Sequence, residues 1–196
     1  MGQEINYKEE QVEFLLEEPS MANLLQVILP KILPTGYALG INCFLRPHQG
    51  KQDLKKSIPK KVRAFSKFYI PTKIIIVHDQ DSNNCKDLKS ELLAVCKKNG
   101  DCPVLIRIAC RELENWYLGD MNAIHKVYAD FKPKKHRYKA KFKEVDSTHG
   151  ANELSILIGD FQKGYASRNI PRFFDIENNS SVSFNQFVSG VRNFLK

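Results

Sequence analysis

Apolar residues along the chain alternate between short runs typical of strands and longer stretches with helical spacing. Runs rich in Ile, Leu and Val at residues 12–16, 37–45, 74–77 and 104–109 predict four strands. The run at 74–77 is apolar throughout, which is typical of a central parallel strand buried on both faces. Strands that alternate with helices predict βαβ units and an α/β fold with a mainly parallel sheet flanked by helices.

Apolar positions spaced three and four residues apart predict helices between these strands. The first helix begins near Ser20, whose hydroxyl can cap it. The second covers residues 54–65, where Pro59 interrupts the helical pattern. The third covers residues 88–96 and leads into an Asn-Gly pair that ends it.

The second half of the chain predicts helices and one basic loop. Residues 132–143 show little periodicity and predict a mobile loop. A short helix is expected at 154–161. A strong C-terminal helix is expected to start at Ser183, which forms a capping box with Gln186.

Length and composition describe one ordinary globular domain. The 196 residues are 42% apolar and 27% charged, and one domain takes about 150 residues. We expect a single domain over residues 1–196, with the sheet and the acidic site in about 10–120 and a basic loop and helical extension in about 121–196. No stretch approaches the ~18 apolar residues that a membrane span needs, so no membrane partner is expected.

The cysteines and the first residues of the chain indicate the compartment. The five cysteines are odd in number and include no Cys-x-x-Cys pair. The first 18 residues are acidic and lack the charged start and apolar core of a secretory signal. We therefore expect free thiols in a reducing cytoplasm.

The net charge of +8 is unevenly distributed. Residues 51–73 and residues 126–143 each carry eight bases and one acid. Two such stretches favour a polyanion such as DNA or RNA as partner, and a merely solvated face is the alternative. The nucleic-acid contacts that we expect are Lys134, Lys135, Arg137, Lys139, Lys141 and Arg168.

Acidic residues follow three of the predicted strands. They are Glu17 and Glu18, then Asp79 and Asp81, then Glu112 and Glu114. The carboxyl ends of parallel strands meet at one edge of a sheet, and residues i and i+2 of an extended chain project to the same side. Such carboxylates can hold Mg²⁺ or Mn²⁺, which can activate a water for phosphodiester cleavage. Taken singly, each pair also fits a surface turn or a helix cap, and His78 fits an ordinary strand residue.

The order of these motifs resembles a known family. Leu-Leu-Glu-Glu at 15–18 and Ile-Ile-Ile-Val-His-Asp-Gln-Asp at 74–81 resemble the TOPRIM domain of topoisomerases, bacterial primases, recombination proteins and OLD-family (overcoming-lysogenization-defect) nucleases. Arg-Glu-Leu-Glu-Asn-Trp-Tyr-Leu-Gly-Asp at 111–120 and Gln-Lys-Gly-Tyr-Ala at 162–166 are similar to a family of small, single-domain, TOPRIM-like bacterial proteins of uncharacterised function, related to OLD-family nucleases. The chain departs from the TOPRIM pattern at Glu18, where many members have glycine.

The resemblance implies a TOPRIM-like (Rossmann-like) sheet and a metal-dependent nuclease that cleaves DNA or RNA. It implies one or two Mg²⁺ or Mn²⁺ ions. It also implies that Lys163 is a basic residue near the scissile phosphate, whose positive charge offsets the negative charge of the transition state. The implied catalytic residues are Glu17, Asp79, Asp81 and Lys163. The implied metal ligands are Glu17, Glu18, Asp79, Asp81, Glu112 and Glu114.

Relatives of this type are often encoded beside ATPases and act as effectors of phage-defence or toxin-like systems. The resemblance therefore implies an AAA- or ABC-type ATPase partner, and it allows a homo-oligomer. Two other functions stay open, a non-catalytic module that binds an ATPase or nucleic acid, and a phosphatase. The phosphatase is considered because residues 74–82 also resemble the first motif of haloacid-dehalogenase-type enzymes, in which the first Asp is the nucleophile. That motif normally lies on the first strand, whereas here at least two strands precede it.

Overall fold

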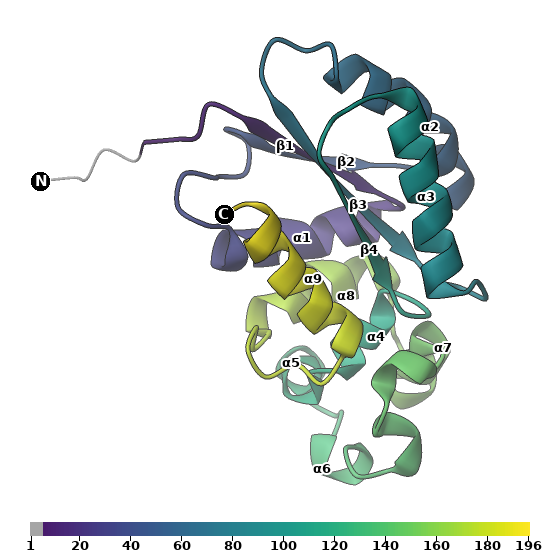
Figure 1. Ribbon diagram of the computed structural model, residues 1–196. Helices are drawn as coiled ribbons and strands as arrows, with labels where there is room; N and C mark the ends of the chain where they lie inside the picture. Colours follow the sequence, from purple (N-terminus) through teal and green to yellow (C-terminus); the bar gives the residue numbers. More distant parts are fainter. Residues whose placement is uncertain (1–5) are drawn as a thin grey trace, which may run out of the picture.

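The computed structural model describes residues 6–196 and shows an α/β fold around one four-stranded sheet (Figure 1). All neighbouring strands are parallel, and their order is β2-β1-β3-β4. The strands are β1 (Gln11–Leu16), β2 (Cys43–Pro47), β3 (Thr72–Asp79) and β4 (Val104–Ala109). The prediction of a parallel sheet flanked by helices is confirmed, and residues 1–5, which the domain prediction includes, lie outside the described residues.

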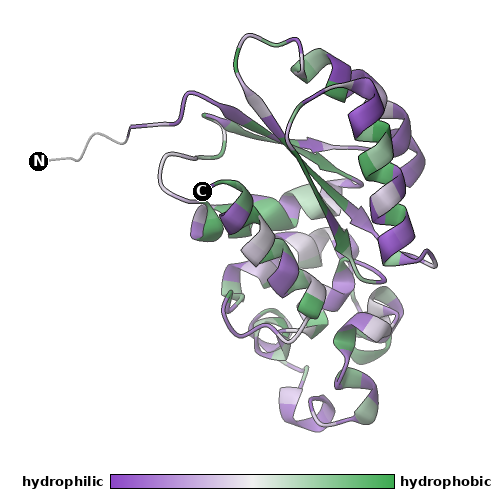
Figure 2. Cartoon of the chain, in the orientation of Figure 1, coloured by the Kyte–Doolittle hydropathy of each residue, from purple (hydrophilic) through white to green (hydrophobic). Residues whose placement is uncertain are grey.

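Helices cover both faces of the sheet (Figure 1). One face carries α2 and α3, and the other carries α1 and α9. These helices are α1 (Pro19–Ile32), α2 (Lys51–Phe65), α3 (Cys85–Asn99) and α9 (Val182–Phe194). Side chains of β3 pack into both layers, which explains why its central residues 74–77 are all apolar. Figure 2 shows the hydrophobic strands enclosed by helices with polar outer surfaces.

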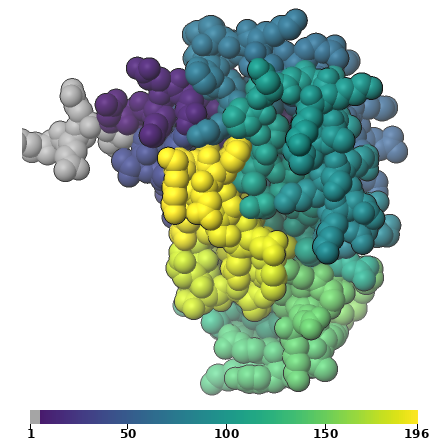
Figure 3. All heavy atoms as spheres, viewed as in Figure 1, coloured from purple at the N-terminus to yellow at the C-terminus, as the bar shows by residue number. Residues whose placement is uncertain are grey.

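The chain after β4 is mostly helical. Its elements are α4 (Glu114–Leu118), α5 (Met121–Val127), α6 (Pro133–His136), α7 (Gly150–Leu157) and α8 (Lys163–Asn169), with the short 3₁₀ helices η1 (Ala140–Phe142), η2 (Val145–Ser147) and η3 (Ile170–Phe173). Figure 3 shows the green segment around residues 130–160 as a lobe at one end of the molecule, below the yellow C-terminal helix. No helix within residues 6–196 combines the length and the apolar character needed to cross a bilayer.

Several predicted boundaries were wrong. The second strand starts at Cys43 rather than at residue 37, because the preceding residues turn back so that the N–H of Cys43 donates to the carbonyl of Ala38. The expected mobile loop at 132–143 is shaped instead by α6 and η1, and the helix expected at 154–161 is α7. Helix α2 is continuous across Pro59, since buried apolar residues on both sides of the proline hold it to the sheet.

The start of α9 also differs from the prediction. Its N-cap is Ser181, whose hydroxyl accepts a hydrogen bond from the N–H of Phe184 (3.1 Å). Ser183 lies inside the helix, and its N–H donates to the carboxylate of Asp146 (2.7 Å). A distant acid therefore supplies the contact that the expected capping box would have made within the helix.

The segment after β4 is held by buried polar contacts. The side-chain amide of Asn115 donates to the carbonyls of Val145 (2.6 Å) and Thr148 (2.9 Å). The indole N–H of Trp116 donates to the hydroxyl of Ser183 (2.9 Å), and the ring is fully buried. These contacts join α4 to the turns before α7 and to α9, and they fix the position of the acid that begins α4.

Replacing Asn115 by alanine is expected to lower the free energy of unfolding by about 2 kcal/mol or more. The variant leaves the carbonyl of Thr148 without its side-chain partner, at about 1–3 kcal/mol, and removes one of the hydrogen bonds to the carbonyl of Val145. Urea unfolding followed by circular dichroism measures the loss. Asn122→Ala is the matched control, because Asn122 is exposed and a surface change of this kind costs within about 0.5 kcal/mol. Equal losses in the two variants would contradict the clamping role of Asn115.

Candidate active site

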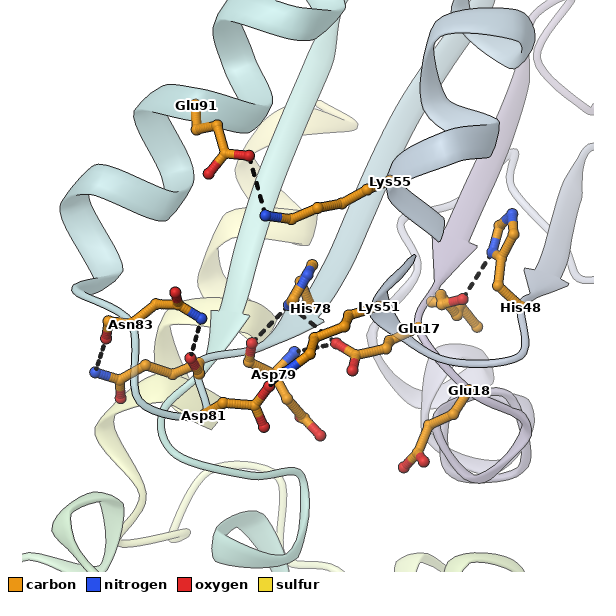
Figure 4. A network of polar contacts seen from close by, with 12 residues as sticks. Glu17, Glu18, His48, Lys51, Lys55, His78, Asp79, Asp81, Asn83 and Glu91 are labelled. Carbon is orange, nitrogen blue, oxygen red and sulfur yellow. Dashed lines mark hydrogen bonds and ion pairs between the residues drawn. The ribbon is translucent and has the colours of Figure 1, made fainter. Parts of the chain in front are cut away.

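Five charged side chains meet where three strands end. Glu17 and Glu18 follow β1, Asp79 ends β3, and Glu114 begins α4 just after β4. Lys163, the first residue of α8, comes from much later in the chain. Since the carboxyl ends of parallel strands share one edge of the sheet, segments that are distant in sequence contribute to one site. Figure 4 shows the acids that follow β1 and β3 gathered at this edge.

Lys163 is the internal counter-ion of this site. Its Nζ lies 2.6 Å from Oε1 of Glu18 and 3.3 Å from Oε1 of Glu114. Burial works against the ammonium, but the carboxylates of Glu114 and Glu18 outweigh it and raise the pKa of Lys163. The lysine therefore stays charged wherever the protein is folded near neutral pH.

The carboxyl group of Asp79 is buried among other acids. Burial is the main cause that raises the pKa of Asp79 well above its ordinary value, and neighbouring carboxylates, led by that of Glu17, add to the effect. The positive charge of Lys163 offsets only part of this shift. Within residues 6–196, Oδ1 of Asp79 has no hydrogen-bond partner.

Glu114 is similarly unsatisfied. Its side chain is fully buried, and burial raises its pKa despite the opposing effect of Lys163. In the described part of the chain, Oε2 of Glu114 has no hydrogen-bond partner, and Oε1 has only the 3.3 Å ion pair with Lys163. Native structures leave few buried polar atoms unpaired, so this carboxylate is a candidate ligand for a bound cation.

The side chain of Glu17 is oriented by β3. Its Oε2 accepts a hydrogen bond from the N–H of Asp79 (2.9 Å) and lies 2.9 Å from Nδ1 of His78. That ring nitrogen also lies 2.5 Å from the carbonyl oxygen of Asp79. Because both neighbours are acceptors, Nδ1 carries the hydrogen. His78, which the sequence favoured as an ordinary strand residue, is thus a buried partner of the first acid (Figure 4).

Asp81 does not join this buried group. Its Oδ2 lies 2.8 Å from Nζ of Lys51, at the start of α2 (Figure 4). The expectation that Asp79 and Asp81 point to the same side assumed an extended chain. The strand ends at Asp79, however, and Asp81 has a left-handed φ of 53°.

Glu112 is also separated from its expected partner Glu114. Its Oε2 accepts a hydrogen bond from the N–H of Ala151 (2.8 Å), in the first turn of α7. The extended geometry assumed for the two glutamates is absent, because Leu113 between them has helical torsion angles and Glu114 begins α4. In this arrangement the carboxylate of Glu112 caps a helix.

The loops after β3 and β4 are bonded to one another. The N–H of Asp81 donates to the carbonyl of Arg111 (2.8 Å), and the N–H of Arg111 donates to Oε1 of Gln80 (2.9 Å). Left-handed backbone is unfavourable for residues other than glycine, and both Asp81 and Arg111 adopt it. Strain of this kind is typical of functional sites, and here it lies at the edge where the acids gather.

The predicted nucleic-acid contacts lie on the surface of the helical part. The exposed side chains are Lys134, Lys135, Arg137, Lys139, Lys141 and Arg168. Five of them belong to α6, η1 and the residues between, at the end of the molecule farthest from the sheet (Figure 1). Arg168 differs, because it lies on α8, the short helix that begins with Lys163.

Two residues near the acids were not among the predicted site residues. The hydroxyl of Tyr117 is buried without a hydrogen-bond partner in the described residues, and burial, followed by Glu114, raises its pKa. Tyr117 follows Glu114 by three residues, so the two side chains lie on the same face of a helix, and this spacing could have identified Tyr117 from the sequence. Lys51 starts the helix after β2, and such positions lie at the carboxyl edge of the sheet.

The donor chemistry of the site fits a divalent cation. Carboxylate oxygens are the ligands that Mg²⁺ and Mn²⁺ prefer, and Asp79 and Glu114 offer three buried oxygens without hydrogen-bond partners. Within residues 6–196, no three His, Cys, Asp or Glu side chains are already arranged to hold a metal ion. Lys163 lies against two of the carboxylates instead, so a divalent cation would compete with it for Glu18 and Glu114.

Replacing Asp79 by asparagine is expected to stabilise the protein in chelating buffer at pH 7–8, because the neutral amide removes the cost of ionising a carboxyl that is buried beside other carboxylates. The folded-state pKa of Asp79 is raised, so the native state loses stability as pH rises above the ordinary value of about 3.9. The advantage of the variant should therefore vanish near pH 4. Urea midpoints measured across this pH range, with exposed Asp101→Asn as control, test it. A variant that is less stable than wild type at pH 8 would contradict the charge burial.

Replacing Lys163 by methionine is expected to destabilise the protein in chelating buffer, because Glu18 and Glu114 lose their counter-ion. The loss should be roughly 1–3 kcal/mol, less than for a fully buried pair, since the lysine is partly exposed. Mg²⁺ should stabilise this variant more than it stabilises the wild type, as shown by thermal unfolding. Adding Glu114→Gln should recover much of the loss, and failure of both rescues would argue against the counter-ion role.

We compared the chain with known protein families, with curated proteins and with solved structures, and none of the three comparisons returned a match. The observations that bear on function are therefore those made on this chain. They are the buried acids of the sheet edge, their unpaired oxygens and the lysine that balances them.

Proposed function

We propose that the protein is a metal-dependent nuclease with a TOPRIM-like fold, which cleaves phosphodiester bonds in DNA or RNA. The observation that carries the proposal is the buried acidic group at the carboxyl edge of the sheet, with unpaired oxygens on Asp79 and Glu114. Catalytic groups with shifted pKa values gather at such crevices. The all-parallel strand order, with acids after the first and third strands along the chain, supports the TOPRIM-like assignment.

The acids divide into groups with different roles. Asp79, Glu18 and Glu114 would hold one or two Mg²⁺ or Mn²⁺ ions. When bound, such ions lower the pKa of a water and offset the charge of a phosphate. Glu17 is held by the N–H of Asp79 and by His78, which orients its carboxylate as a ligand or general base.

Lys163 would change partners when substrate binds. In the absence of substrate its ammonium lies between Glu18 and Glu114. Glu18 and Glu114 would hold the metal ion, and the ammonium of Lys163 would offset the charge that develops on the phosphate in the transition state. Asp81 and Lys51 form a more exposed pair at the same edge, so Asp81 serves as a ligand only if it leaves Lys51.

The charge of the chain supports a polyanionic substrate. The protein carries +8 overall, and the stretch 51–73 reaches the sheet edge at Lys51. The exposed bases from Lys134 to Lys141 would contact the backbone farther from the acids, with an affinity that falls as salt rises. The proposed function also includes a partner protein, an AAA- or ABC-type ATPase. The nuclease would then act as the effector of a phage-defence or toxin-like system.

A non-catalytic module is the second candidate, and one observation favours it. Lys163 already neutralises part of the acidic group, so the acids can persist without a metal ion. A haloacid-dehalogenase-like phosphatase is less well supported. Its nucleophile would be Asp79, which lies at the end of β3, after two earlier strands, whereas the phosphatase motif normally lies on the first strand.

The decisive experiment compares wild type with Asp79→Asn, a variant expected to fold at least as well. Each is incubated with Mg²⁺ or Mn²⁺ and with plasmid, single-stranded DNA and tRNA. We expect cleavage by wild type, its loss in chelator, and a decrease of about 100-fold or more in the variant, since a positioned acid–base or ligand group contributes that much. Asp101→Asn, an exposed change of the same kind, should cleave normally.

Two outcomes would count against the nuclease. Equal cleavage by wild type and Asp79→Asn would point to a contaminating enzyme. No cleavage by wild type, alone or with an ATPase that co-purifies with it, would favour the non-catalytic module.

A further inference from the structure

A second cluster of charged side chains lines a small cavity beside the edge strand β4. The cavity has a volume of about 210 Å³ and lies between α3, β4 and the first turn of α9 (Figure 1). Arg107 from β4 and two lysines from α3, Lys86 and Lys89, line it. Ser183 and Gln186 of α9 add neutral polar groups. None of these residues belongs to the acidic site.

Arg107 has almost no partner within the protein. Its Nη1 donates to the carbonyl of Ile106 (3.2 Å), and its Nε is buried without a hydrogen-bond partner in residues 6–196. Burial alone lowers the pKa of Arg107, with no contribution from a carboxylate. An arginine that is half-buried in this way is normally paired, because a buried charge is costly without a counter-ion.

Helix α9 leaves a space that the guanidinium occupies. A Cβ atom built on Gly190 would lie 2.1 Å from Nη2 of Arg107 and 2.2 Å from its Nε. Any larger residue at this position would therefore displace the guanidinium. Glycine here allows the arginine to lie against the helix, which limits its movement and leaves its planar group of donors pre-organised.

The other cations and the size of the cavity indicate the ligand. Lys86 and Lys89 are three residues apart on α3, so they share one face of the helix, and neither forms an ion pair within the described residues. The cavity lining that the structure describes includes three cations and no carboxylate. At 210 Å³ it exceeds the roughly 30 Å³ of one water but lies below the ~300 Å³ typical of pockets for drug-sized molecules.

We propose that this cavity binds a phosphate group, with Arg107 as its main donor and Lys86 and Lys89 as supporting charges. Arginine donates two parallel hydrogen bonds to a phosphate, and it is preferred where such a group is recognised in a partly dry site. The group can belong to a free phosphorylated compound or to the end of a nucleic-acid strand. Only the second source depends on the proposed nuclease function.

Binding of inorganic phosphate is measured by calorimetry at constant ionic strength, with chloride as the competing salt. We expect wild type to bind, and Arg107→Gln to bind at least about tenfold more weakly, since a hydrogen bond to a charged group is worth about 1.4 kcal/mol or more. Arg63→Gln, which removes the same charge from the exposed surface of α2, is the matched control and should bind as wild type does. Asp79→Asn should also bind normally, so this result is independent of the nuclease assay.

Gly190→Ala is a second variant, which displaces the guanidinium of Arg107 without removing its charge. The added methyl group meets the end of a flexible side chain rather than backbone, so the fold should survive while the guanidinium moves away. We expect the same loss of phosphate binding, with an unchanged circular dichroism spectrum.

The source of the phosphate is separated by comparing oligonucleotides with a 5′-phosphate and a 5′-hydroxyl. A preference for the phosphorylated strand that is lost in Arg107→Gln would assign the cavity to strand ends. Binding of inorganic phosphate without this preference would assign it to a free compound. No binding by wild type, or equal binding by Arg107→Gln and Arg63→Gln, would overturn the proposal.

Discussion

The burial of negative charge at one edge of the sheet is the constraint on which the arrangement of this protein depends. Asp79 and Glu114 are buried, and the raised pKa of each carboxyl follows from that burial. Lys163 reaches the acids from α8 and joins the last third of the chain to the carboxyl edge of the strands. Without a compensating cation, this edge would be under mutual repulsion, so the position of α8 and the position of the acids are coupled.

The helices after β4 serve this edge. Asn115 is hydrogen-bonded to the turns before α7, and Trp116 is hydrogen-bonded to α9. Glu114 directly precedes these two residues, so their contacts fix its carboxylate beside Lys163. Glu112 caps α7 and adds to the same scaffold. The segment at 111–120 is thus largely a structural clamp that positions the carboxylate of Glu114.

The sequence predicted the layers well because those depend on local patterns. Residues 74–77 are apolar throughout since both faces of β3 are covered, and this is visible without knowing what covers them. The sequence did not predict features that depend on a contact with a distant residue. The start of α9 is an example, because Asp146 accepts a hydrogen bond from the N–H of Ser183, and the N-cap is Ser181.

The candidate site shows the same division. Glu17, Asp79 and Glu114 lie at the carboxyl edge of the sheet, as the order of the strand ends predicts, and Lys163 contacts Glu114 there. Asp81 and Glu112 do not, because the extended geometry that the pairing assumed is absent: Asp81 has a left-handed φ, and Leu113 between the two glutamates is helical. The loops that carry Asp81 and Arg111 are also hydrogen-bonded to one another across 30 residues, and no local pattern contains such contacts.

The structure buries unpaired polar atoms of two kinds, acidic oxygens at one place and an arginine nitrogen at another. Within residues 6–196, Oδ1 of Asp79 and Oε2 of Glu114 are buried without a donor, while Nε of Arg107 is buried without an acceptor. Both groups flank the sheet near β4, yet each points to a different ligand, a cation for the acids and an oxyanion for the arginine. The acids require a cation whichever oxyanion the cavity takes. The proposed nuclease and the proposed phosphate cavity are therefore independent of one another, and each is tested by variants that leave the other intact.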